Sequence, residues 1–408
     1  MRTSAHKFSQ KVLGEGGVRL VSTLYVLLLA THLGAENFGR YSTAMAYAAL
    51  CIVFVDLGTN AILTREIARQ PSQRVRMAQT SHFLKVAASI GSWAILLAVT
   101  YILHFSAEQR FLTLCLGIVA IGQTLTEYFG ALLNGIEEMG WEAFLKVVSR
   151  TIALGFAFWA LFAGKPISVI VTTMAWGSLL SYAVAVLIVR YRLGSFGFEI
   201  NPVFLKSLFQ ACLPLFGCVL FWILYDSQDV LLLNYFHFPQ REIGWFSAAM
   251  KVIDVLRVYP VLMMGVYFPV LSRLHLSDPG AFRRKQRRLL LFMTVSLVVL
   301  AAAVYAASPA IVRLLYKSDF APASDLLRRL LPALVGMGLT HVQMQILIAL
   351  NQERKLLWVA FATCACNLLF AWILLPRIGV RGVCYALVGS ETVYFILLRR
   401  VAAASISP

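Results

Sequence analysis

Long apolar stretches joined by short polar links run from one end of the chain to the other. Each stretch is about 20 residues long, enough at about 1.5 Å per residue for a helix to cross the roughly 30 Å of a membrane's hydrocarbon core. The stretches cover residues 12–33, 38–63, 82–104, 111–135, 143–163, 167–190, 211–236, 244–270, 289–315, 327–351, 356–375 and 380–400. The pattern predicts twelve membrane-spanning helices. Since the first residues, MRTSAHKFSQ, are polar, we expect the first helix to be an anchor and not a removable signal peptide.

The composition supports this prediction. Of the 408 residues, 60% are hydrophobic and 13% are charged, and the mean hydropathy is +0.76. The chain therefore has more apolar side chains than the core of one soluble domain would bury. The net charge of +17 lies mostly in links on one predicted side of the membrane, including FRRKQRR at 282–288. By the positive-inside rule this side is cytoplasmic, together with both termini. The basic run therefore indicates topology and contact with anionic lipids, and we expect no nucleic acid partner.

The sequence contains no pattern typical of an enzyme or a metal site. All seven cysteines lie in apolar stretches, where they act as small core residues, so no disulfide framework is expected. The chain lacks a glycine-rich phosphate loop, a nucleophile elbow and a cluster of metal ligands. We therefore predict no catalytic residue, no bound metal and no cofactor.

An internal match divides the chain into two halves. FGRYSTAM at 38–45 aligns with IGWFSAAM at 243–250, pairing Gly39 with Gly244, and the offset is close to half the chain length. Six helices per half return the chain to its starting side, so the halves are parallel repeats, as in many transporters. The prediction is an all-α polytopic membrane protein with lobes 1–203 and 204–408 around a central cavity.

Three prolines inside the apolar stretches predict kinks or hinges. Pro214, Pro260 and Pro332 each lack the backbone N–H that an α-helix needs. Static kinks filled by packing are the alternative to moving hinges.

Charged side chains inside the stretches need a polar surrounding, because each costs about 2.5–3.5 kcal/mol at a helix centre. Lys85, Lys146 and Arg313 lie near helix ends, where they can extend to the membrane surface. Lys146 and Arg150 share one helix face, and these like charges repel unless an anion lies between them.

Other basic residues have acidic neighbours on the same helix. Arg19 lies four residues after Glu15, and Lys251, Asp254 and Arg257 follow one another at intervals of three with one positive charge in excess. Such spacing lets each acid offset a neighbouring base along one helix face.

Two aspartates stand in LYDSQDVLLLNY, residues 224–235. Asp226 and Asp229 share a helix face that carries no base. Either they pair across the bundle with Arg257, Lys251 or another base, or one of them titrates or binds a cation during transport. Crowded carboxylates in a region of low dielectric favour keeping one protonated, which suits a carrier driven by protons.

Three segments resemble a known family. They are LGAENFGRYSTAMAYAALCIVFVDLGTNAILTREIAR at 33–69, DVLLLNYFHFPQREIGWFSAAMKVIDVLRVYPVLMMGVYFPVLSRL at 229–274 and LLPRIGVRGVCYALVGSE at 374–391. They look like bacterial Wzx-type flippases of lipid-linked oligosaccharides, in the multidrug/oligosaccharidyl-lipid/polysaccharide (MOP) superfamily that includes MurJ and the MATE exporters. The resemblance spans nearly the whole chain.

The resemblance implies a function and a set of site residues. The chain would move undecaprenyl-pyrophosphate-linked O-antigen or similar glycan units across the bacterial inner membrane by alternating access, driven by H⁺ or Na⁺. A pyrophosphate in hydrocarbon needs positive charge and hydrogen-bond donors. The predicted cradle is Arg19, Lys146, Arg150, Lys251 and Arg257, and the predicted ion-coupling residues are Asp56, Asp226 and Asp229. Further expected partners are a polysaccharide polymerase and a chain-length regulator.

Two other functions compete with this one. A MATE-like exporter of small cations shares the architecture but favours an acidic cavity with few bases. A membrane glycan polymerase or ligase acts on the same lipid-linked substrates but usually needs a larger extracytoplasmic loop than the one near KSDFAP.

Overall fold

The computed structural model describes the backbone of residues 2–194, 199–350 and 352–406, and it omits the side chains of residues 1–21, 23, 214, 218, 276, 279, 353–354 and 403–406. Every regular element in this part of the chain is helical. The long helices are α1 (Arg2–Asp56), α3 (Arg74–Ile102), α4 (Ala107–Gly135), α5 (Met139–Phe162), α6 (Ile167–Leu193), α7 (Pro202–Tyr235), α9 (Val258–Ser277), α10 (Pro279–Leu315), α11 (Ala323–Ala349), α12 (Glu353–Ile378) and α13 (Arg381–Ile406). The shorter ones are α2 (Thr59–Arg69), α8 (Gln240–Leu256), η1 (Pro71–Gln73) and η2 (Ser318–Phe320). The predicted all-α class is confirmed.

Eleven stretches of the described chain are long and apolar enough to cross a membrane. The count is one below the predicted twelve because the first stretch, Leu24–Arg69, joins the second half of predicted span 12–33 to span 38–63. Helix α1 bends at Gly34, whose φ of 73° and ψ of 170° are not helical. Glycine adopts such a positive φ without strain, so the chain can turn there between two spans.

The chain forms two compact units. The first unit contains residues 1–33 and 40–223, and the second contains residues 34–39 and 224–408. The division falls inside α7, between Ile223 and Leu224, some 20 residues after the boundary that the sequence suggested at 203/204. The short segment 34–39, which follows the bend of α1, packs with the second unit.

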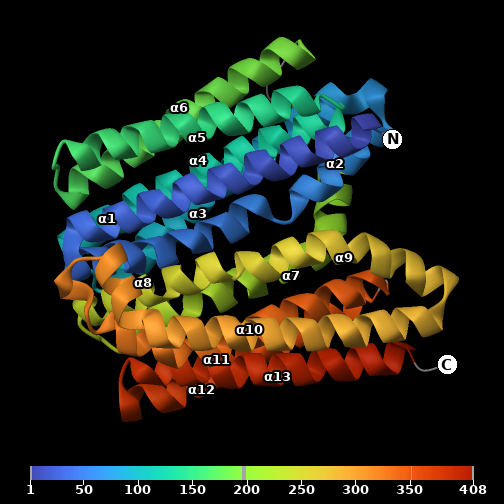
Figure 1. Ribbon diagram of the computed structural model, residues 1–408. Helices are drawn as coiled ribbons and strands as arrows, with labels where there is room; N and C mark the ends of the chain where they lie inside the picture. Colours follow the sequence, from blue (N-terminus) through green and yellow to red (C-terminus); the bar gives the residue numbers. More distant parts are fainter. Residues whose placement is uncertain (1, 195–198, 351, 407–408) are drawn as a thin grey trace. The chain divides into compact units, whose positions relative to one another are not determined.

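One helix occupies the centre of each unit. In the first unit α4 packs against α2, α3, α5 and α6, and in the second α11 packs against α8, α9, α10, α12 and α13. Both are the fourth helix of their predicted half, and both bury 61% of their most apolar window. Figure 1 shows the long helices of each unit lying side by side along their lengths. Equivalent helices thus have equivalent packing.

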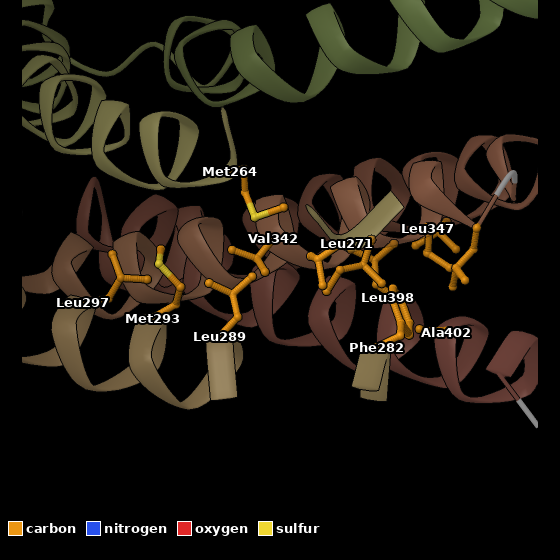
Figure 2. Close-up of a cluster of buried hydrophobic side chains, with 13 residues drawn as sticks. Met264, Leu271, Phe282, Leu289, Met293, Leu297, Val342, Leu347, Leu398 and Ala402 are labelled. Carbon is orange, nitrogen blue, oxygen red and sulfur yellow. The ribbon is translucent and has the colours of Figure 1, made fainter. Parts of the chain in front are cut away.

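Each unit has its own apolar core. In the first unit, α4 contributes Tyr128, Phe129 and Leu132, which pack with Leu63 of α2 and Val189 of α6. In the second, side chains of α9, α10, α11, α12 and α13 interlock, and Figure 2 shows Met264, Met293 and Val342 at one end of this cluster and Leu347, Leu398 and Ala402 at the other. Van der Waals packing of these side chains holds the helices together, because in a membrane the lipid tails are as apolar as the side chains themselves.

Proline explains one break in the second unit. The predicted span 244–270 is split into α8 and α9 at Arg257, three residues before Pro260. Pro260 lacks the N–H that would bond to Leu256, and its ring crowds that carbonyl. The predicted kink at Pro260 is confirmed, whereas α11 continues through Pro332. The side chain of Pro214 lies outside the described residues.

The two glycines paired by the internal repeat lie against each other inside the second unit. A Cβ on Gly39 would lie 1.7 Å from the Gln240 carbonyl oxygen, and one on Gly244 would lie 1.9 Å from the Ala35 carbonyl oxygen. Next to this crossing, Asp319 of η2 accepts a 2.7 Å hydrogen bond from the Ala35 N–H and pairs with Arg241. Glycine at both positions permits a backbone contact that no side chain would allow.

Candidate functional site

In the first unit, Asp56 and Lys85 form a buried ion pair. Asp56 is the last residue of α1, where helical carbonyls lack partners. The Lys85 ammonium donates to the Asp56 carbonyl at 2.8 Å and lies 3.3 Å from its Oδ1. The Lys85 side chain is only 1% exposed. The expectation that Lys85 extends to the membrane surface is therefore wrong, because the end of α1 supplies both a charge and a carbonyl that hold it inside.

The pair Lys146 and Arg150 is compensated from both sides. Glu142 pairs with Lys146 one turn earlier on α5, and Arg150 donates its Nε–H to Ser22 Oγ at 3.1 Å. Glu127 of α4 lies within electrostatic range of both bases and of Lys85. The protein thus places two carboxylates, those of Glu142 and Glu127, near these like charges. The predicted span began at residue 143 and so left Glu142 outside it, whereas α5 begins at Met139.

In the second unit, four charged groups form a chain around the break between α8 and α9. Lys251 donates to Asp254 at 3.0 Å, and the Arg257 guanidinium lies 3.4 Å from Asp254 and 3.9 Å from Asp226. The four side chains are between 34% and 58% exposed. Asp226 therefore pairs with Arg257 of a neighbouring helix, which is one of the two alternatives that the sequence left open. The distance of 3.9 Å is too long for a hydrogen bond. The single excess positive charge expected along α8 is balanced by Asp226 from α7.

Asp229 has a different environment from Asp226, although the two are three residues apart. It is buried, and its carboxylate accepts a 3.2 Å hydrogen bond from the Asn367 side-chain amide of α12. No base contacts it among the described residues. The neighbouring Gln228 Nε2 and the Asn367 Oδ1 are buried without a hydrogen-bond partner in the same part of the structure. Such unsatisfied polar atoms are rare in folded proteins.

Glu391 is a second buried acid in this unit, and sequence reasoning had not selected it as a site residue. Its carboxylate accepts hydrogen bonds from Tyr225 at 2.6 Å and Thr340 at 2.9 Å. The spacing along the chain gives no signal for this contact, because α7, α11 and α13 meet only in the folded unit. An acidic residue within the last apolar stretch was the only available indication.

The structure thus brings the predicted residues together in two groups. Asp56, Lys146 and Arg150 belong to the first unit, around Glu127, and Asp226, Asp229, Lys251 and Arg257 belong to the second. Arg19 lies outside the residues whose side chains are described.

Solved structures of membrane transporters have a fold similar to this one. An inward-facing multidrug resistance MATE family transporter of the MOP superfamily superposes with a TM-score of 0.73 at 16% identity, over 95% of each chain. The lipid II flippase MurJ in an inward closed conformation gives 0.68 at 14% identity, over 96% of this chain and 87% of that one. An outward-facing MATE transporter gives 0.62 at 16% identity, over 95% and 93%.

The sequence comparison is more specific. The model of the polysaccharide biosynthesis protein family matches residues 5–275, so the chain belongs to that family. No curated protein sequence matches it. The family match confirms the expected link to polysaccharide biosynthesis, and the structural similarity to MATE and MurJ proteins confirms the expected fold.

Proposed function

We propose that the protein is a flippase that moves undecaprenyl-pyrophosphate-linked oligosaccharide units, of O-antigen or a similar polysaccharide, from the cytoplasmic to the periplasmic leaflet of the bacterial inner membrane by alternating access. Membership of the polysaccharide biosynthesis family supports the substrate class. The asymmetry of basic residues supports cytoplasmic termini. Anionic lipids, the polymerase and the chain-length regulator are the proposed partners.

One observation carries the proposal: basic side chains remain accessible within apolar helices. Lys146 is 46% exposed, Lys251 41% and Arg257 34%. Arg257 holds its two carboxylate partners at 3.4 and 3.9 Å, so most of its N–H donors are available to an incoming anion. A pyrophosphate bound by two or three such groups would gain charge-assisted hydrogen bonds where water is scarce. Arg19 and Arg150 complete the proposed cradle.

Asp229 is our proposed ion-coupling residue. A buried carboxylate beside the Asn367 amide, whose Oδ1 has no hydrogen-bond partner, offers oxygen ligands that hard cations prefer, and it can also take a proton. Asp56 and Asp226 have basic partners in this structure. Their coupling roles stay predictions that require those pairs to open during transport.

The test is genetic. Deleting the gene should leave lipid-linked repeat units on the cytoplasmic leaflet, and the wild-type gene should restore export. Arg150→Ala and Arg257→Ala should abolish export while the protein remains in the membrane at normal abundance. Arg313→Ala, at the exposed end of α10, is the matched control and should export normally. Full export by both site variants would remove these arginines from the substrate path.

A MATE-like exporter is the second candidate, because a MATE transporter superposes with a TM-score of 0.73. Export of a cationic drug by the purified protein in vesicles, with no accumulation of lipid-linked glycan in the deletion strain, would favour it over the flippase.

A further inference from the structure

The second unit contains a cavity that neither charge cluster uses. It has a volume of about 370 Å³ and lies where α8 and α11 begin and α12 turns into α13. The lining residues are Glu242, Trp245, Pro322, Asp325, Leu326, Ile378, Gly379, Val380 and Arg381. All of them belong to one compact unit, so the cavity depends only on the packing within that unit. Its volume lies near the lower end of the range of roughly 300–1,000 Å³ for small-molecule sites.

Glu242 supplies an unengaged acceptor. It lies in the first turn of α8 and is half-buried. Its carboxylate has no hydrogen-bond or ion-pair partner among the described residues. The helix dipole favours a negatively charged side chain at this end of α8. Both oxygens can therefore accept hydrogen bonds from a ligand.

Asp325 and Arg381 supply donors and acceptors next to it. The Asp325 carboxylate accepts from Arg329 Nε at 3.0 Å and lies 3.3 Å from Arg381 Nε. The Arg381 side chain is 59% exposed. Its two terminal NH₂ groups have no hydrogen-bond partner in the described part of the chain, so they remain for hydrogen bonds in a fixed planar geometry.

Trp245 adds an oriented aromatic surface. Its Nε1–H donates to the Asp319 carbonyl at 2.8 Å, which fixes the plane of the ring. The ring is half-buried, and the apolar side chains of Leu326, Ile378 and Val380 complete the wall. An amphipathic ligand can place C–H groups on these apolar surfaces and hydroxyls on the charged groups.

We propose that this cavity binds an uncharged sugar residue. A sugar ring combines apolar C–H faces with hydroxyls that both donate and accept, matching Trp245, Glu242 and Arg381 respectively. An anion would be repelled by Glu242. A cation attracted to Glu242 would be repelled by Arg381, which lines the same cavity. A neutral polyol can hydrogen-bond to Glu242 and Arg381 and lie against Trp245 without bringing a further charge into the cavity.

The inference rests on the proposed function for its biological role. The basic run 282–288 lies at the other end of α10 from η2, so the cavity belongs to the end of the unit opposite the proposed cytoplasmic side. It would hold a sugar of the repeat unit on the periplasmic side, separately from the pyrophosphate cradle. A glycan held there would be less free to return with its lipid.

The test measures binding by the purified full-length protein in detergent, using isothermal titration calorimetry. The probe is the repeat-unit oligosaccharide released by mild acid from the strain's own lipid-linked intermediate, which carries neither pyrophosphate nor prenyl chain. Glu242→Gln and Arg381→Gln should each weaken binding by at least tenfold. Arg377→Gln, in the last turn of α12, exposed and outside the cavity, is the matched control and should bind like the wild type.

The variants distinguish an effect on folding from an effect on ligand binding. Glu242→Gln keeps the shape of a side chain that has no partner to lose, so an unchanged melting midpoint with weakened binding assigns the effect to the ligand. Wild-type affinity in both cavity variants, or no binding by the wild type, overturns the cavity proposal. If the gene restores export while the wild-type protein does not bind the probe, only the cavity proposal fails. If the probe binds through Glu242 while deletion leaves export intact, the cavity proposal stands and the flippase proposal fails.

Discussion

The two units have equivalent helices at their centres, α4 and α11, but their charged side chains have different surroundings. Around α4, the first unit closes Lys85 onto Asp56 as a buried ion pair. Around α11, the second unit leaves Lys251, Asp254, Arg257 and Asp226 half-exposed and buries two acids, Asp229 and Glu391, against neutral partners.

The difference indicates a division of roles. A buried pair that also satisfies the end of a helix is difficult to open, since breaking it strands a charge. An exposed chain of charges can exchange partners with an anion at little cost, and a buried acid with neutral partners responds to a proton or a cation. We therefore expect substitutions in the buried pair of Lys85 and Asp56 to affect stability most, and substitutions in the accessible charges of the proposed cradle to affect transport.

The largest effect is expected from Lys85→Met. Removing the ammonium leaves the Asp56 carboxylate and carbonyl without their partner, and losing one member of a buried pair costs about 3–5 kcal/mol. Lys251→Met, in the exposed chain, should cost about 1 kcal/mol or less. Melting midpoints of the two purified variants check this comparison. Equal midpoints would contradict the proposed difference between the units.

Gly244→Ala should come next. Its methyl group would lie 1.9 Å from the Ala35 carbonyl oxygen, so the backbone must shift, and overpacking of this kind costs about 1–3 kcal/mol. Gly39→Ala should behave alike, because the two glycines meet at one crossing. Gly91→Ala is the control, since nothing lies within 4 Å of its added Cβ. Thermal unfolding of all three variants measures the effect, and a loss as large for Gly91→Ala as for Gly244→Ala would argue against the crossing as its cause.

Asp229→Asn should change transport and leave stability within about 1 kcal/mol, because the amide keeps the shape of the side chain and removes a buried charge. The dependence of transport on pH or on Na⁺ should be lost. Asp226→Asn, in the exposed chain, should retain it. Transport of lipid-linked glycan by reconstituted protein, followed over pH and Na⁺ concentration, separates the two aspartates. An unchanged dependence in Asp229→Asn would indicate a structural role.

The smallest effect is expected at Asp319, in the link between α10 and α11. The Ala35 N–H and the Arg241 guanidinium lower the pKa of its carboxyl below the ordinary value of 3.8. A lowered pKa in the folded state contributes stability above the ordinary pKa, and this contribution is lost as the pH falls through the folded value. One-third exposure limits it to about 1 kcal/mol or less. Asp319→Asn should therefore melt slightly below the wild type at pH 7 and converge with it as the pH falls through the lowered pKa, and a constant difference would contradict this account.

Helix positions were largely readable from the chain because the bilayer imposes a length on every apolar stretch. The break at Pro260 was readable too, since a missing N–H acts within one turn. The partners of the charged residues could not be predicted from the chain. Lys85 was placed at the surface and Glu142 outside the membrane, because a position along one helix does not reveal which neighbouring helix supplies a partner.

The class of protein, the approximate spans, the internal match of Gly39 with Gly244 and the family resemblance could be predicted from the chain alone, because they depend on local composition and periodicity. The folded units were needed to show that Asp226 pairs while Asp229 is buried beside Asn367, and that Glu242, Trp245 and Arg381 line one cavity. These groups lie on different helices, and which of them meet depends on how the apolar faces pack within a unit.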